Sequence, residues 1–131
     1  KSVEDEIDAK IIYCTNVPWE EAMIELQRSS ILIIPSRIES IPQTIKEAYY
    51  FKTPVIATKV GGIPEIVTND ETGILISPEN SSELINSVNS LLSDNLKIKT
   101  LTNNAYEFVT KNYSWDYLLP KYVNFYQNLL S

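Results

Sequence analysis

The sequence contains no histidine, a single cysteine and only three glycines. Without histidine, neither a Ser-His-Asp triad nor a Cys-His pair can form, and most kinds of zinc site are excluded too. Cys14 has no second cysteine to pair with, so we expect a reducing compartment, namely the cytoplasm. Because Cys14 ends an apolar run that begins at Ile11, we expect it to be a small residue of the core.

The chain also lacks an excess of basic residues and any long apolar run. Its 11 Lys and Arg residues are outnumbered by 17 Asp and Glu residues, and the net charge is −6. A nucleic-acid surface needs a basic footprint, so we expect no nucleic-acid partner. A phosphorylated small molecule stays compatible with this charge, because a helix N-terminus holds phosphate without net positive charge. No apolar stretch approaches the ~20 residues of a membrane-spanning helix.

Four short apolar runs without polar alternation predict strands that are buried on both faces of a parallel sheet. They are Lys10–Cys14, Ile31–Pro35, Pro54–Thr58 and Gly73–Ile76. Helical patterns lie between these runs, and the chain is purely helical after the last one. This alternation with short connections predicts an α/β layer fold with a helical C-terminal segment.

Helical periodicity fills the segments between and after the strands. Apolar residues at i, i+3, i+4 and i+7 predict a buried face on a helix that begins at Trp19 and on another over Ser82–Ser93. Asn80 and Glu83 have the spacing of a capping box ahead of the second helix. A further helix is predicted over Leu96–Lys111.

The last helix is predicted over Trp115–Leu130, with Ser114 as its N-cap. Pro120 lies inside it, where the missing N–H and the ring predict a kink or a helix that restarts. Because tyrosine suits half-exposed interfaces, the tyrosines of this segment predict a packing surface rather than a ligand site. They are Tyr113, Tyr117, Tyr122 and Tyr126.

The helix predicted over Ile41–Phe51 has features of a phosphate site. Ser40 as an N-cap, with Gln43 three residues later and Pro42 in the first turn, indicates where the helix starts. It follows the strand Ile31–Pro35, and ligands of open α/β sheets bind at the carboxyl ends of strands. Free N–H groups and the positive end of the helix dipole suit a diphosphate there.

Glu39 lies just before this helix, and Glu47 lies roughly two turns further along the chain. At ~1.5 Å rise per residue, Glu47 is ~9–12 Å from the predicted start, about the distance from a diphosphate to the far side of a ribose. A carboxylate there accepts hydrogen bonds from vicinal hydroxyls. The spacing alone is weak evidence, because Glu71 and Glu79 are also eight residues apart.

The residues around the first pair resemble a known signature. The run Ile31–Ala48 reads as an apolar strand, Pro-Ser, two residues, Glu, seven residues and Glu-Ala, which closely resembles the family-four retaining glycosyltransferases. The resemblance continues through Thr53–Thr58, Gly61–Val67 and Thr72–Ile76, and it reaches Tyr113–Trp115. It implies a Rossmann-like parallel sheet layered with helices, the C-terminal half of a GT-B fold, which binds a nucleotide-diphosphate sugar.

The resemblance also implies roles for individual residues. The family's first glutamate lies beside the donor sugar and the diphosphate, and the second holds the ribose, so Glu39 is implied to be catalytic and Glu47 donor-binding. The backbone that follows usually supplies N–H groups to the donor, here from Ser40, Ile41, Gln43 and Thr44. The family often has Gly-Phe-Gly at the first three positions, and Pro42 at the third has no N–H to offer.

Two loops each have two interpretations. Gly61 and Gly62 follow a strand, where glycine serves either a tight turn or a close approach to the ligand; Gly62 belongs to the donor site in the second case. Asn16 follows the first predicted strand, in a loop that the family uses near the nucleobase. It either reads base edges or is a turn residue before Pro18.

The implied reaction transfers a hexose to a saccharide or lipid-linked acceptor with retention at the anomeric carbon. The donor is a nucleotide-diphosphate sugar, and neither a cofactor nor a metal ion is expected. The transition state would resemble an oxocarbenium ion, with leaving-group charge met by the helix dipole and basic residues. Glu39 and Glu47 are too far apart along one helix to flank a scissile bond as glycosidase carboxylates do.

The resemblance begins late in the family's pattern. The family's domain normally opens with a strand that carries an Arg and a Lys on the diphosphate, and a strand ending in Gly follows; neither is found in residues 1–131. In the strand order 3-2-1-4-5-6, both would lie between Lys10–Cys14 and Ile31–Pro35. We therefore expect residues 1–131 to be a single, partial nucleotide-sugar-binding domain. Its expected partner is the missing acceptor-binding N-terminal domain, or a separately encoded front half through which the protein could reach the inner face of the membrane.

Two other functions stay open. One is a non-catalytic or regulatory half-domain that binds a nucleotide sugar. The other is a sugar-nucleotide epimerase of GT-B fold, although the absence of histidine and the retaining-type signature count against it.

Overall fold

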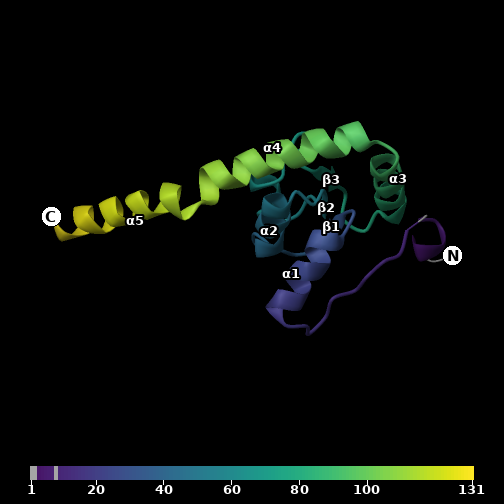
Figure 1. The fold of residues 1–131 in the computed structure, drawn as a ribbon, viewed down its shortest axis with the longest axis horizontal. Coiled ribbons are helices and arrows are strands. Elements are labelled where there is room, and N and C mark those ends of the chain that lie inside the picture. Colours follow the sequence, from purple (N-terminus) through teal and green to yellow (C-terminus); the bar gives the residue numbers. More distant parts are fainter. Residues whose placement is uncertain (1–2, 8) are drawn as a thin grey trace.

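The computed structural model describes residues 3–7 and 9–131, which form a three-stranded parallel sheet layered with helices (Figure 1). The strands lie in the order β1-β2-β3 and are Leu32–Ile34, Val55–Thr58 and Ile74–Ile76. In this register Ile33 pairs with Ile56, which pairs with Ile74 on its other side. The parallel α/β fold and three of the four predicted strands are therefore confirmed.

The described part of the chain contains five α-helices and two short 3-10 helices. The α-helices are α1 (Trp19–Arg28), α2 (Gln43–Phe51), α3 (Ser81–Leu92), α4 (Asn95–Tyr113) and α5 (Trp115–Leu130). The 3-10 helices are η1 (Val3–Asp5) and η2 (Ile63–Glu65). All the predicted helices are present, and the predicted Asn80 cap of α3 is confirmed, since its side chain accepts from the Glu83 N–H at 3.0 Å. No helix among the described residues is long and apolar enough to cross a bilayer.

β2 is the central strand, and its side chains alternate between two cores. Val55 and Ala57 face a core built with α1, α2 and α4, whereas Ile56 faces a core that includes residues of α3 and the first part of α4. All four residues of β2 are buried. Burial on both faces explains why the run 54–58 shows no polar alternation.

Tyr49 fixes α2 against the sheet from within the first core. Its side chain is fully buried, and its hydroxyl is hydrogen-bonded to the Ile66 carbonyl oxygen at 3.2 Å and to Thr72 Oγ1 at 3.0 Å. Burial raises the pKa of Tyr49 to about 12, and the hydrogen bond with Thr72 opposes that shift. Phe108 of α4 meets the ring edge-on, with 6.3 Å between the ring centroids. The position of α2 is therefore set by α4 and by the segment between η2 and β3.

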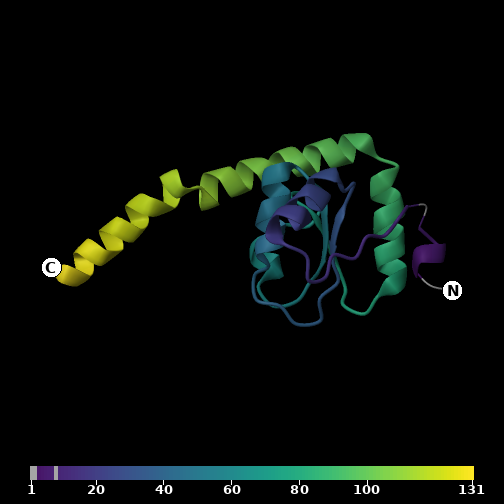
Figure 2. The same ribbon diagram turned by 60° about the horizontal axis from the view of Figure 1, so that its bottom comes forward.

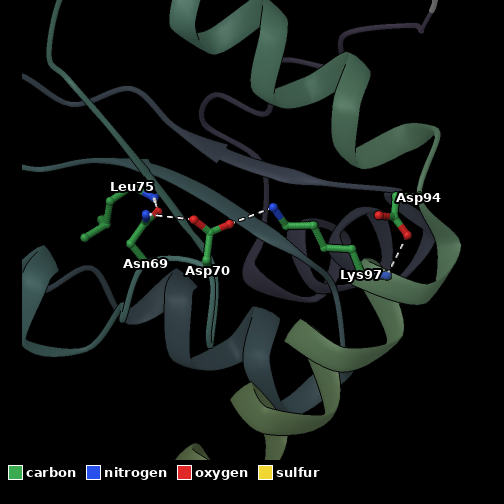
Figure 3. Close-up of polar contacts among 5 residues, drawn as sticks. All are labelled: Asn69, Asp70, Leu75, Asp94 and Lys97. Atoms are coloured by element: carbon green, nitrogen blue, oxygen red, sulfur yellow. Dashed lines mark hydrogen bonds and ion pairs between the residues drawn. The ribbon is translucent and has the colours of Figure 1, made fainter.

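The two edge strands of the sheet differ in their hydrogen bonds to side chains. At β3, the Asn69 side chain accepts a hydrogen bond from the Leu75 N–H at 2.8 Å and donates to Asp70, which pairs with Lys97 of α4 at 2.6 Å (Figure 3). The three residues of β1 are only half-buried, and among the described residues only β2 pairs with this strand. An open strand edge of this kind is a template for another strand.

The strand predicted at Lys10–Cys14 is not formed. Residues 10–14 belong to no strand or helix, and Ile12, Tyr13 and Cys14 are exposed. A strand needs a hydrogen-bonded neighbour, and no strand of the described residues pairs with this segment. The prediction that Cys14 belongs to the core is wrong for the same reason.

α5 extends away from the rest of the molecule (Figures 1 and 2). It contains no buried residue, and its large apolar side chains, such as Trp115, Phe125 and Leu130, are exposed. Of the four tyrosines expected to form a packing surface, Tyr113 at the end of α4 packs against Phe108, whereas those of α5 are exposed. Figure 2 shows that the helix leaves the body at the end of α4.

The prediction that α5 restarts at Pro120 is wrong, because the helix is continuous from Trp115 to Leu130. Pro120 removes the hydrogen bond to the Asp116 carbonyl. Both residues are exposed, so water can satisfy that carbonyl. A bend at Pro120 stays a prediction. The prediction that Ser114 is the N-cap of α5 is confirmed, since Ser114 Oγ accepts a hydrogen bond from the Tyr117 N–H at 3.3 Å.

The turn after β2 packs directly against the loop that leads into α2. Gly61 has a φ of +51°, and a Cβ atom there would lie 1.6 Å from the Glu39 carbonyl oxygen. Gly62 donates its N–H to the Ser40 carbonyl oxygen at 2.8 Å, and a Cβ atom there would lie 2.5 Å from that oxygen. Gly61 thus forms a tight turn, and both glycines allow this turn to lie close to the Glu39–Ser40 backbone.

We expect Gly61→Ala to lower the free energy of unfolding by about 2 kcal/mol or more, because the added methyl group collides with the Glu39 carbonyl and the left-handed backbone disfavours a side chain. Urea denaturation measures this change. Glu65→Ala, an exposed substitution in the same segment, is the control and should change the value by less than ~0.5 kcal/mol. Equal stability of Gly61→Ala and the unmodified chain would contradict the packing described here.

Candidate functional site

The loop between β1 and α2 holds Glu39 in a small hydrogen-bond network. Ser36 Oγ donates to Glu39 Oε2 at 3.4 Å, and the Ser40 N–H donates to Glu39 Oε1 at 3.1 Å. Thr58, the last residue of β2, donates its hydroxyl to the Ser36 carbonyl oxygen. The half-buried carboxylate of Glu39 is therefore oriented by its own loop, and that loop is tied to the end of the central strand.

Ser40 does not cap α2, so that prediction is wrong. The helix begins at Gln43, with Pro42 at the N-cap position and no side-chain hydrogen bond to the first turn. Ser40 lies outside the helix because its N–H is bonded to Glu39 and its carbonyl to Gly62.

The first turn of α2 keeps backbone donors free. The N–H groups of Gln43 and Thr44 make no hydrogen bond to any described residue. These donors and the positive end of the helix dipole lie at the carboxyl edge of the sheet, because α2 follows the end of β1. The arrangement can bind an anion.

Glu47 lies one turn into α2. At ~1.5 Å rise per residue, it is ~6 Å along the axis from Gln43, less than predicted because the helix starts later than expected. Glu47 is half-buried, and its Oε1 accepts a hydrogen bond from Trp19 Nε1 of α1 at 3.1 Å. Among the described residues, no cation forms an ion pair with this carboxylate.

Glu47 faces a groove of about 670 Å³ between α1, α2, the end of α4 and the start of α5. The lining of this groove combines aromatic rings with polar groups. The rings are Trp19, Tyr50, Phe51, Tyr113, Trp115 and Tyr122, and the polar groups are Gln43, Lys46 and Glu47. Such a mixture suits an organic ligand with several hydroxyl groups.

The predicted site residues fall into two groups that follow each other along the chain. The first group surrounds the loop and consists of Glu39, Ser40, Ile41 and Gly62, which contact one another. The second group lies at the start of α2 and consists of Gln43, Thr44 and Glu47. Gln43 and Glu47 line the groove, and Thr44 is half-buried.

Asn16 belongs to neither group. It is exposed and has a φ of +56°, a left-handed conformation that asparagine tolerates in turns. This geometry favours the turn interpretation, and a contact with a nucleobase stays a prediction.

Two residues of the site were not predicted. Trp19 has the helical spacing of a core residue, yet 63% of it is exposed. It is the first residue of α1, and this terminal position could have indicated that Trp19 belongs to a site and not to the core. Ser36 belongs to the Pro-Ser pair of the signature, and its hydroxyl reaches Glu39 three residues later.

Basic side chains are few around the site. Arg37 pairs with Glu79 at 2.9 Å, but both side chains are largely exposed, so this pair contributes little. Lys46 lies over the ring of Tyr113, 4.8 Å from its centroid. Within residues 3–7 and 9–131, no group of three His, Cys, Asp or Glu residues could hold a metal ion.

Comparison with known proteins identifies the family. Residues 2–108 match the sequence model of the family described as glycosyl transferases group 1. An uncharacterised glycosyltransferase of Methanocaldococcus jannaschii is 34% identical over 98 residues, which are 75% of this chain and 28% of that protein. The chain therefore spans less than a third of that relative.

Solved structures share the fold. Sucrose-phosphate synthase from Thermosynechococcus elongatus has a TM-score of 0.82 at 27% identity, over 91% of this chain and 30% of that one. Anabaena HepE in complex with UDP has a TM-score of 0.76 at 25% identity, over 79% of this chain and 29% of that one. The chain belongs to the group 1 glycosyltransferase family and has the α/β fold of the C-terminal half of a GT-B enzyme.

Proposed function

We propose that this chain binds a nucleotide-diphosphate sugar and is the donor half of a retaining glycosyltransferase. The observation that carries the proposal is the open first turn of α2, with Glu39 before it and Glu47 one turn into it. The N–H groups of Gln43 and Thr44 would donate to the diphosphate at the positive end of the helix dipole. Anabaena HepE, a structural relative, binds UDP and UDP-glucose, which supports this class of donor.

Glu47 is assigned to the ribose. Glu47 lies ~6 Å along the helix axis from Gln43, within the span of a diphosphate and the sugar attached to it. A carboxylate can accept hydrogen bonds from two vicinal hydroxyls at once. Trp19 occupies only part of the acceptor capacity of Glu47, so capacity for these hydroxyls remains.

Glu39 is assigned to the transferred hexose. Its carboxylate would stabilise positive charge at the anomeric carbon in an oxocarbenium-like transition state. The leaving diphosphate would be stabilised by the N-terminus of α2, without a metal ion or a cofactor. Ile41 offers an N–H to the donor, whereas Ser40 can do so only when Glu39 releases its N–H.

The acceptor, a saccharide or a lipid-linked sugar, needs a second half of the enzyme. We propose that an N-terminal GT-B domain supplies it, either on the same polypeptide or separately encoded, and that the transferase acts in the cytoplasm or at the inner face of the membrane. Two surfaces support such a partner, namely the open edge of β1 and the uncovered helix α5. The matched region is only 28% of the relative from M. jannaschii, which supports it further.

A non-catalytic half-domain that binds a nucleotide sugar is the second candidate. The observation that favours it is the scarcity of basic groups at the site: neither Arg37 nor Lys46 forms an ion pair with Glu39 or Glu47 in the described structure. Donor hydrolysis in the presence of a supplied front half distinguishes the two: turnover indicates the enzyme, and binding without turnover indicates the half-domain.

Glu47→Ala should weaken the binding of UDP by about 1.5–3 kcal/mol, the usual effect of losing hydrogen bonds to a charged group. Isothermal titration calorimetry with UDP measures this loss. Glu71→Ala is the matched control, because Glu71 is an exposed glutamate of the other pair with the same spacing, and its removal should leave the affinity unchanged. An unaltered affinity of Glu47→Ala would rule out the ribose assignment.

The 131-residue chain on its own should transfer no sugar at the rate of a complete enzyme. Without an acceptor site, the rate enhancement that comes from holding donor and acceptor together is lost. Removal of even one group that stabilises the leaving-group charge typically lowers the rate ~10²–10³-fold. An assay of the purified chain with nucleotide sugars and with saccharide or lipid acceptors tests this. Turnover like that of an ordinary transferase would show that the chain needs no second half.

A further inference from the structure

We propose that Trp19 is a positioning residue for the donor nucleoside: its indole N–H holds Glu47 in the orientation that receives the ribose hydroxyls. This inference rests on the proposed function, because the orientation of Glu47 matters only if Glu47 holds the ribose. It concerns the groove wall where α1 meets α2.

The contact joins two helices that are far apart in the sequence. Trp19 Nε1 donates to Glu47 Oε1 at 3.1 Å across 28 residues of chain. An indole nitrogen is only a donor and a carboxylate is only an acceptor, so the pair has a single hydrogen-bonding arrangement. The bond uses one acceptor position of Oε1, and Oε2 stays available to a hydroxyl.

The helices themselves are held in a fixed relation. Met23 and Leu26 of α1 are buried in the same core as Ile45 of α2. Thr53, which follows α2, donates its hydroxyl to the Leu26 carbonyl oxygen at 3.0 Å. Because the two helices are fixed, the hydrogen bond from Trp19 can select one rotamer of Glu47 before a ligand binds. The side-chain entropy lost on binding is then smaller.

The exposure of Trp19 argues against a purely structural role. A tryptophan contributes most to stability when its large ring is buried, yet 63% of Trp19 is exposed. The ring lines the groove together with Gln43, Glu47 and Tyr50.

Trp19→Phe tests the proposal, because it removes the N–H donor and keeps an aromatic ring. The probes are UDP and 2′-deoxy-UDP, each titrated calorimetrically into the full chain, which should prefer UDP. In Trp19→Phe the affinity for UDP should fall about 3–10-fold, the effect of one lost hydrogen bond. The affinity for 2′-deoxy-UDP should fall less, so that the preference for UDP decreases. Equal losses for both probes, or no loss, would overturn the proposal.

Tyr126→Phe is the control. It also removes a hydrogen-bond donor and keeps an aromatic ring, at an exposed residue of α5 that does not line the groove. It should leave the ratio of the two affinities unchanged. Thermal unfolding is measured for each variant: an unchanged Tm of Trp19→Phe supports positioning, and a large drop with equal losses for both probes indicates a structural role and overturns the proposal.

Glu47→Ala separates this inference from the proposed function. If Glu47→Ala keeps full affinity and the full preference for UDP, the ribose assignment itself fails. If Glu47→Ala loses the preference and Trp19→Phe keeps it, Glu47 holds the ribose without help from Trp19 and only the inference fails.

Discussion

The contact between the Gly61–Gly62 turn and the Glu39–Ser40 backbone determines where the rest of the site lies. Any Cβ atom at position 61 would overlap the Glu39 carbonyl oxygen, so the two segments can approach this closely only with glycine there. The Gly62 N–H then fixes the Ser40 carbonyl. Once the loop is held in this way, Ser40 cannot cap the helix and α2 begins at Gln43 with free backbone donors. A single steric constraint thus places a carboxylate beside a helix end that has free backbone donors.

The remainder of the domain supports this arrangement, and two of its surfaces are not covered by any described residue. Burial of β2 on both faces fixes the sheet, and the Tyr49 hydroxyl holds α2 to the segment that follows η2. Each outer strand pairs only with β2 within the described residues, but the Asn69 side chain bonds one N–H at the β3 edge, whereas β1 is half-buried. α5 exposes its apolar side chains in the same way. All residues of the proposed donor site therefore come from this chain, and the open surfaces are where we propose that a second half packs.

Sequence patterns predicted the features whose partners lie nearby or in the core. The buried strands need apolar runs, and the partner of Asn80 is only three residues away. The run 10–14 was mispredicted because an apolar run does not reveal whether a neighbouring strand exists. Ser40 was mispredicted as a cap because its backbone is engaged by a distant turn. The bond between Trp19 and Glu47 joins two helices, and no local pattern encodes such a contact.

The central claim is that the open N-terminus of α2 holds the diphosphate of a nucleotide sugar. The amide resonances of Gln43 and Thr44, followed by nuclear magnetic resonance during titration with UDP and with uridine, test it most directly. We expect UDP to shift both resonances strongly, because its phosphates accept from these N–H groups, and uridine to shift them little. If UDP binds and leaves both resonances in place, the diphosphate lies elsewhere and the claim is wrong.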